Sequence, residues 1–347
     1  MSEQIALTAD NLPDYLTFMK VCGAGQPVAV EPVGDGNINW VRRARTAAGS
    51  WVVKQARPAL ERFPEYQAPT ERIVIEARFY ETVAPFDTES VCPRVELFDP
   101  EQRVLVLEDL GDAERLDAAL ARAADVTSAA TCLARFLGAV HRGTSDDARA
   151  QPFENFASFE NEAMRRLHGD HIFLLPYREN EFPLSERVAR RAEELRDDAA
   201  LVRTIDDAYA RYLETRSCLV HGDVQPANVL LTDGGPKLLD AEIAHMGDPA
   251  FDMGQLLGHL LLPAAARREP GAADSAIAAT WRAYTNVWNG APPFAVADAA
   301  RYGGIELLRR TVGAARVPAV ADDEAALAVI DAGLAWIREA PTARQLQ

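Results

Sequence analysis

The 347-residue chain contains 48% hydrophobic and 25% charged residues, the composition of a globular protein with one large or two modest domains. Its net charge of -16 argues against a nucleic-acid partner, because nucleic-acid-binding proteins need a basic surface. No apolar run reaches membrane-spanning length and no signal peptide is recognisable, so we expect a cytoplasmic protein without a membrane partner. The four cysteines lack metal-ligand spacing and are expected to be reduced thiols.

The first 110 residues have the pattern of a small antiparallel sheet with one main helix. A short helix is expected within residues 7–21, and the main helix at residues 70–84. Apolar runs predict five strands, at residues 28–33, 40–44, 51–55, 91–95 and 103–107. We therefore expect residues 1–110 to form one lobe.

Three features of this lobe are candidates for binding a nucleotide. A glycine-bearing turn can lay backbone N–H groups over phosphates, although most such turns are only turns; its candidate residues are Gly34, Asp35, Gly36, Asn37 and Asn39. Glu76 falls on the apolar face of the main helix, where a carboxylate is costly unless it is paired. Lys54 is its natural partner, and such a pair aims an ammonium group at phosphates; otherwise Glu76 turns to the rim. The connector at Glu108 and Leu110 is similar to a kinase hinge, whose backbone binds adenine.

The polar stretch at residues 221–228 lies between two apolar runs and predicts a loop held between buried strands. Asp223 and Asn228 have the spacing found in kinase catalytic loops, where the aspartate accepts a hydroxyl proton and the asparagine holds Mg²⁺. After the next strand, Asp240 and Glu242 supply two carboxylates for the same metal. Glu242 is expected to be a metal ligand or a substrate contact.

Residues 111–347 are expected to form a larger, mostly helical lobe, with helices at residues 131–142, 153–167 and 185–215. The apolar segment at residues 173–177 is expected to be exposed and to wall a substrate pocket. His141 is interpreted as a helix-terminal residue near backbone carbonyls, and Asp252 as an anchor for the catalytic-loop backbone. Arg309 and Arg310 are candidate substrate contacts, although Arg310 can also pair with Glu306 and do nothing more.

Together these motifs resemble the aminoglycoside-phosphotransferase-like kinases, which implies an α+β, bilobal protein-kinase-like fold using ATP and Mg²⁺. Three details are most similar to the 5-methylthioribose kinases: the loop at residues 34–39, the Asp-X-Glu motif at residues 240–242, and the twin arginines at residues 309–310. The resemblance implies transfer of the γ-phosphate to methylthioribose or a related pentose, a sugar-binding role for both arginines, and a homodimer.

One departure leaves the acceptor open. The Pro226-Ala227-Asn228 sequence is closer to the wider superfamily than to the methylthioribose kinases, which points to another sugar-like alcohol as an alternative. An aminoglycoside kinase is a second alternative, since an acidic surface suits a polycation, and a choline or amino-sugar kinase is a third. The non-enzyme alternative is a nucleotide-binding pseudokinase.

Overall fold

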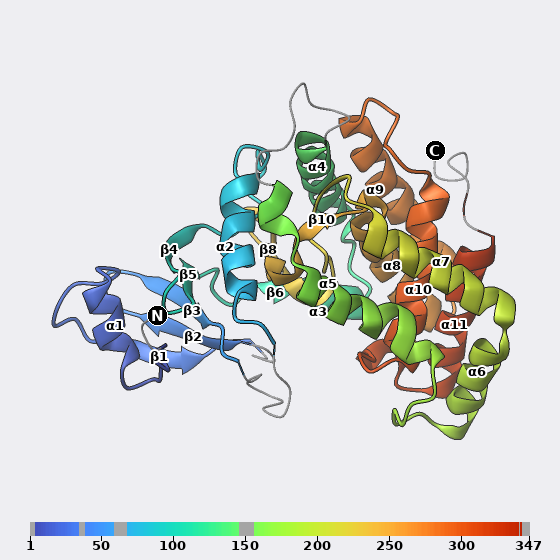
Figure 1. Ribbon diagram of the computed structural model, residues 1–347, viewed down its shortest axis with the longest axis horizontal. Helices are drawn as coiled ribbons and strands as arrows, with labels where there is room; N and C mark the ends of the chain where they lie inside the picture. The colour runs from blue at the N-terminus through green and yellow to red at the C-terminus, as the bar shows by residue number, and fades with distance from the viewer. Residues whose placement is uncertain (1–3, 35–38, 59–67, 146–155, 340, 342–347) are drawn as a thin grey trace.

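A small sheet and a larger helical part lie side by side in the computed structural model, which describes residues 4–34, 39–58, 68–145, 156–339 and 341 (Figure 1). The expected division into an N-terminal antiparallel sheet and a mostly helical C-terminal part is confirmed. The sheet ends with β5 at Glu108, and β6 already pairs with β8 of the second part. We propose the lobe boundary between residues 110 and 111.

The N-terminal sheet has five antiparallel strands in the order β1-β2-β3-β5-β4. The strands are β1 (Ala29–Pro32), β2 (Trp40–Arg45), β3 (Ser50–Gln55), β4 (Val95–Asp99) and β5 (Val104–Glu108). The prediction of a strand at residues 91–95 was wrong in position. The N–H groups of Val91 and Cys92 donate to the Asp87 carboxylate instead of to a neighbouring strand, so the ladder begins only at Val95.

Two helices cover this sheet. The apolar residues Leu12 and Leu16 of α1 (Leu12–Phe18) are buried in a cluster with Val53 and Val104. On α2 (Arg72–Val83), the predicted apolar face is buried and Glu76 is buried with it. The inward position of Glu76, expected from helical periodicity, is therefore confirmed.

The C-terminal part is built mainly from helices. They are α3 (Leu116–Ala121), α4 (Thr127–Thr144), α5 (Glu162–Gly169), α6 (Glu186–Asp197), α7 (Ala199–Glu214), α8 (Pro249–Ala266), α9 (Asp274–Val287), α10 (Val296–Val312) and α11 (Asp323–Arg338). Its strands are β6 (Glu114–Arg115), β7 (Cys218–Val220), β8 (Val229–Thr232), β9 (Gly235–Leu238) and β10 (His245–Gly247). The single helix expected at residues 185–215 is two helices, because Asp198 caps α7 by accepting from the N–H groups of Ala200 and Leu201.

Helices α8 and α10 pack closely because glycines face each other at their crossing. A Cβ atom added to Gly258 would lie 2.9 Å from the Gly303 backbone. The described residues of α8 are almost all buried, so this helix forms the centre of the C-terminal part. The close approach holds α10 against α8, and α10 carries the buried residues Glu306, Arg309 and Arg310.

The segment after α5 departs from the expectation of an exposed wall. A π-helical turn at Asp170–Leu174 follows α5 directly, and a 3₁₀ turn at Leu175–Tyr177 follows it. Phe173 is buried, and its ring is stacked on that of Tyr209 with centroids 5.2 Å apart. The expectation was wrong because these aromatic rings pack into the core.

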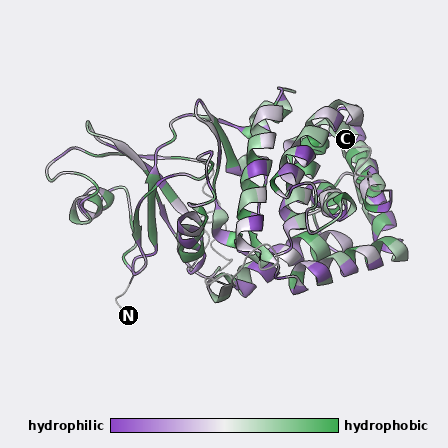
Figure 2. Cartoon of the chain, turned by 90° about the horizontal axis from the view of Figure 1, so that it is seen from above, coloured by the Kyte–Doolittle hydropathy of each residue, from purple (hydrophilic) through white to green (hydrophobic). Residues whose placement is uncertain are grey.

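Hydropathy follows this packing. In Figure 2 the strands of the sheet are largely hydrophobic, and the peripheral helices alternate between hydrophobic and hydrophilic residues. Among the described residues, no helix combines the length and apolar character needed to cross a membrane.

Candidate active site

The loop after β7 is held from behind by a carboxylate of α8. Asp252 accepts hydrogen bonds from the N–H groups of His221 (2.7 Å) and Gly222 (2.9 Å), as the sequence predicted for an anchoring residue. Gly222 has a φ of +82°, and a Cβ there would lie 2.8 Å from the Ile243 carbonyl oxygen, so a larger residue would strain this turn. The loop backbone is therefore held from behind by Asp252, and within the loop Asn228 Nδ2 also donates to the Asp223 carbonyl at 3.1 Å.

His141 extends this anchor, and its role was missed in the sequence. It is fully buried, with Nε2 3.1 Å from Asp252 Oδ2 and Nδ1 3.0 Å from the Tyr284 hydroxyl. It was interpreted as a residue near helix-terminal carbonyls. The available signal was its position four residues after Leu137, on the apolar face of the helix.

Asp223 presents its two carboxylate oxygens to different surroundings. Oδ2 accepts from Gln225 Nε2 (2.7 Å) and Asn228 Nδ2 (2.8 Å), whereas Oδ1 has no hydrogen-bond partner among the described residues. Burial alone would raise the pKa of Asp223, but the His168 imidazole where it is protonated, and the guanidinium groups of Arg310 and Arg309 at every pH, outweigh burial and lower the pKa. The carboxylate is therefore ionised at neutral pH and ready to accept a proton.

Arg309 and Arg310 share one buried carboxylate. Glu306 accepts from Arg309 Nη1 at 3.1 Å and from Arg310 Nε at 2.6 Å. Arg310 Nη2 also donates to Gln225 Oε1 at 2.7 Å, and Gln225 in turn donates to Asp223. The i,i+4 pair with Glu306 is confirmed, and Arg310 contacts Gln225 as well, while the substrate role of both arginines stays a prediction. Both arginines lie beside the loop that carries Asp223.

Lys54 joins the two parts of the molecule. Its ammonium group donates to both Glu76 oxygens, at 2.8 and 2.7 Å, and to Asp240 Oδ1. Burial alone would lower the pKa of Lys54, but the carboxylates of Asp240 and Glu76 outweigh it and raise the pKa. The predicted pairing of Lys54 with Glu76 is confirmed, and Lys54 is charged wherever the nearby carboxylates are ionised.

Glu242 lies buried behind Asp240. Its Oε2 accepts from Asn39 Nδ2 at 2.9 Å and lies 3.5 Å from Arg72 Nε. Asn39 also accepts from Arg72, so its amide connects a cation to a carboxylate. Burial raises the pKa of Glu242 to about 7, against the attraction of Lys54. Arg72 was missed in the sequence because its partners lie far away along the chain.

The predicted hinge is braced by a cation from the sheet. Arg43 donates to Asp109 at 3.0 Å and to the Gly111 carbonyl at 2.5 Å. Glu108 accepts from the Arg94 N–H at 2.9 Å, and Leu110 is partly buried. Of the predicted glycine turn, Gly34 has a φ of +68°, whereas Asp35, Gly36 and Asn37 lie outside the described residues.

The oxygen donors at the predicted metal site fit a nucleotide-bound Mg²⁺ better than an all-protein metal cage. Within the described ranges, no group of three His, Cys, Asp or Glu side chains is placed to hold a metal. Asp240 is 46% exposed and adopts a left-handed φ of 64°, and the Leu239 N–H donates to the Asn228 carbonyl at 2.8 Å. This bond keeps Asp240 close to Asn228. Proteins usually bind Mg²⁺ through one or two of their own oxygen atoms, and phosphates and water supply the remaining ligands.

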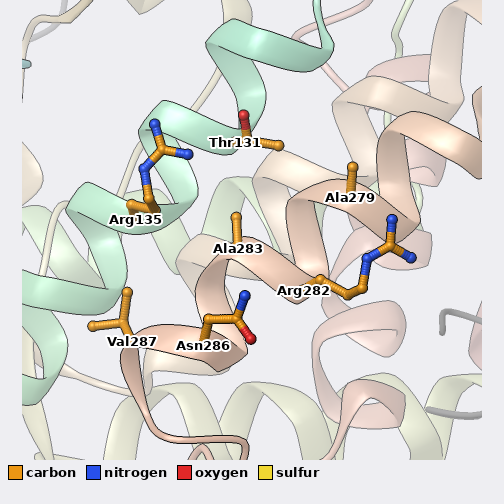
Figure 3. A pocket seen from close by; sticks show the side chains of 7 residues that line it. All are labelled: Thr131, Arg135, Ala279, Arg282, Ala283, Asn286 and Val287. Carbon is orange, nitrogen blue, oxygen red and sulfur yellow. The ribbon is translucent and has the colours of Figure 1, made fainter.

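A separate pocket of about 490 Å³ lies on the surface between α4 and α9 (Figure 3). Arg135 and Arg282 come from the two facing helices, and Arg135 is paired with Glu89. None of the residues lining this pocket is a predicted site residue.

Comparisons with known proteins agree with this geometry. Residues 29–294 match the phosphotransferase enzyme family. A methylthioribose kinase of Pectobacterium atrosepticum is 30% identical over 370 aligned residues, covering 91% of this chain and 88% of the relative. A methylthioribose kinase of Bacillus thuringiensis is 27% identical, covering 84% of this chain and 80% of the relative.

Solved structures share the fold at low sequence identity. A choline kinase of Streptococcus pneumoniae has a TM-score of 0.54 and 15% identity, covering 95% of this chain and 98% of the other. A spectinomycin phosphotransferase in complex with ADP and spectinomycin has a TM-score of 0.53 and 12% identity, with 96% and 99% coverage. These structures confirm the expected bilobal protein-kinase-like fold.

Proposed function

Because this chain belongs to the phosphotransferase enzyme family and is a small-molecule kinase with a hydroxyl acceptor, we propose that it phosphorylates 5-methylthioribose or a closely related pentose. The curated relatives named methylthioribose kinase support this acceptor. The observation that carries the proposal is the connection of Arg310 through Gln225 to Asp223, with Arg309 and Arg310 sharing the Glu306 carboxylate.

We assign the nucleotide to the contact between the two lobes. Lys54, oriented by Glu76, would hold the α/β-phosphates, and the turn at residues 34–39 would cover them. The hinge backbone at Glu108 and Leu110 would bind adenine. Asp240 and Asn228 would hold Mg²⁺, with Glu242 assisting as ligand or substrate contact. Bound Mg²⁺ would offset the negative charge of the phosphates.

Asp223 is assigned as the proton acceptor. The acceptor hydroxyl would donate to Asp223, and its oxygen would form a bond to the γ-phosphorus as the bond to ADP breaks. Gln225 and Asn228 hold one carboxylate oxygen and so fix the direction of the other. The chain's own contribution is thus placement of a carboxylate that stays ionised, together with arginines that can stabilise negative charge on the incoming group.

The charges around Asp223 favour a neutral sugar over an amine. Glu306 is shared by Arg309 and Arg310, and both cations lower its pKa well below the ordinary range although burial alone would raise it. The Glu306 carboxylate is therefore already paired with two cations and is not free to bind a cationic acceptor. Choline and aminoglycosides carry positive charge that two neighbouring guanidinium groups would repel.

The test is ADP formation from MgATP against a panel of methylthioribose, ribose, other pentoses, choline and a kanamycin-type aminoglycoside. We expect turnover with methylthioribose or another pentose, and none with the two cationic acceptors. Turnover confined to choline or to the aminoglycoside would overturn the acceptor while leaving the kinase assignment in place.

A further inference from the structure

His168 lies next to Asp223 and has no role in the site described so far. It stands in the last turn of α5, with only 7% of its surface exposed. Its Nε2 atom is 3.7 Å from Asp223 Oδ1, which is too long for a direct hydrogen bond. The contact connects residues 55 positions apart, so no local motif indicates it.

The facing atoms of this pair are unpartnered. Neither ring nitrogen of His168 has a hydrogen-bond partner among the described residues, and the same is true of Asp223 Oδ1 and of Arg309 Nε. Buried polar atoms are normally hydrogen-bonded, and those left unpaired in a native protein indicate a place for a ligand or water. An oxygen atom at ordinary hydrogen-bond length from both Nε2 and Oδ1 fits their 3.7 Å separation.

The local backbone keeps His168 in this position. The π-helical turn at Asp170–Leu174 begins two residues later, and such turns are frequent at functional sites. Gly169 lets the ring of Tyr209 approach so closely that an added Cβ would lie 2.6 Å from it. The His168 ring also lies edge-on to Phe251, with centroids 6.2 Å apart. The imidazole is thus fixed by packing, and its buried nitrogens have no hydrogen-bond partner among the described residues.

His168 is neutral at physiological pH. Burial lowers its pKa to about 4, and the charge of Arg309 adds to this effect. A neutral imidazole carries one N–H, and the unpartnered Asp223 Oδ1 is an acceptor. The pair therefore offers one donor and one acceptor, which is what a hydroxyl group requires.

We infer that His168 is a second acceptor-binding residue: its Nε2–H donates to the acceptor hydroxyl oxygen while that hydroxyl donates to Asp223 Oδ1. This inference rests on the proposed kinase function and holds for any hydroxyl acceptor. During transfer the hydroxyl proton passes to Asp223, the oxygen binds the γ-phosphorus and ADP leaves. His168 keeps its own proton throughout and acts by holding the oxygen.

The test compares His168→Leu, which removes the donor, with His168→Gln, whose amide can place a donor near the position of Nε2. In His168→Leu the KM for the acceptor should rise about tenfold, with the KM for ATP unchanged. His168→Gln should recover most of the loss. The control is His171→Leu, a partly buried histidine on the same segment, which should behave like the parent protein.

Two results would overturn the inference. If His168 only orients Asp223, kcat falls in His168→Leu while the acceptor KM stays constant. If His171→Leu raises the acceptor KM equally, the effect is a general disturbance of the segment.

The assay uses methylthioribose, or whichever panel acceptor the parent enzyme phosphorylates best. The test of His168 therefore stays valid even if the acceptor proposed above is not the true one. A second measurement needs no acceptor: slow ADP formation with water in the acceptor position should fall in His168→Leu and recover in His168→Gln. Unchanged hydrolysis in His168→Leu would also contradict the inference.

Discussion

The two halves of the candidate site differ in their balance of charge. On the nucleotide side, the carboxylates of Glu76, Asp240 and Glu242 face Lys54 and Arg72. On the proposed acceptor side, the carboxylates of Asp223 and Glu306 are matched by the guanidinium groups of Arg309 and Arg310, which pair with Glu306 and lower the pKa of Asp223. The first half therefore has an excess of negative charge, whereas the second is balanced.

This difference indicates what each half is suited to bind. An excess of carboxylates favours an added cation, and Mg²⁺ would supply it together with the phosphates. The acceptor side needs no added charge, and its arginines hold Asp223 ionised while His168 stays neutral. The contrast thus separates a proposed metal–phosphate half from a proposed neutral-acceptor half. Three substitutions test it, and a fourth tests the acid stability of the strand behind the loop.

The largest effect is expected from Asp223→Asn. The amide cannot accept the hydroxyl proton, so kcat should fall by about 10²- to 10⁴-fold. Nucleotide affinity, measured by calorimetry with ADP, should change little because Asp223 belongs to the acceptor side. A large loss of ADP binding would show that the loop is structural and would contradict the separation of the two halves.

The next effect is expected from Asp240→Asn, which removes a negative charge from the nucleotide side. The Mg²⁺ concentration needed for half-maximal activity should rise by roughly 10- to 100-fold, because the metal loses a charged oxygen ligand. Asp233→Asn, at an exposed position after β8, is the matched control. An unchanged Mg²⁺ dependence in Asp240→Asn would show that the metal is held elsewhere.

A third prediction concerns His245, which lies in β10 behind the loop. Burial lowers its pKa to about 4, and its Nδ1 donates to the Ile243 carbonyl at 2.8 Å. Between pH 6.5 and 4 the unfolded chain binds a proton that the folded protein does not bind, so stability falls as the pH falls through this window.

His245→Asn keeps a donor near the position of Nδ1 and removes the titration. At pH 5 it should recover about 2 kcal/mol of the acid-induced loss, roughly 30-fold in the folding equilibrium. Urea unfolding at pH 5 and pH 7 measures the difference between the two pH values in each protein. An equal pH dependence in both proteins would mean that His245 titrates normally.

The smallest effect is expected from Arg310→Lys. The lysine keeps the charge but cannot contact Glu306 and Gln225 with the same planar fork, so kcat should fall about 5-fold. Arg316→Lys, a partly buried arginine beyond α10 that contacts backbone carbonyls, serves as the comparison. Equal kinetics in Arg310→Lys and the parent protein would show that Arg310 only pairs with Glu306 and does not contribute to catalysis.

Prediction from the sequence succeeded best where the functional residues lie in short motifs. The inward position of Glu76 follows from helical periodicity, and its pairing with Lys54 follows from the cost of a buried charge. The placement of Asp223 and Asn228 on one loop follows from their spacing between two apolar strands. In each case the decisive contacts lie within one element or between two neighbouring ones.

Failures arose where a distant partner decides the outcome. The Asp87 carboxylate accepts hydrogen bonds from the N–H groups that would have joined the predicted strand at residues 91–95 to a neighbouring strand. His141 and His168 contact carboxylates 111 and 55 positions away, and nothing in their local sequence identifies those carboxylates. In the sequence, Arg72 is an ordinary arginine at the end of a predicted helix, and only the structure shows that Glu242 lies beside it. Such contacts depend on packing between lobes and helices.

The π-helical turn at Asp170–Leu174 has a consequence for how this enzyme could diverge. A π-helical turn corresponds to one residue inserted into a helix, and each residue of an α-helix rotates the chain by about 100°. Deleting one residue there would restore α-helical register and swing His168 away from Asp223 relative to the aromatic residues that follow. A single codon gained or lost in this segment would thus exchange one acceptor-facing side chain for another. The residues proposed to bind the nucleotide lie outside this segment and would be unchanged.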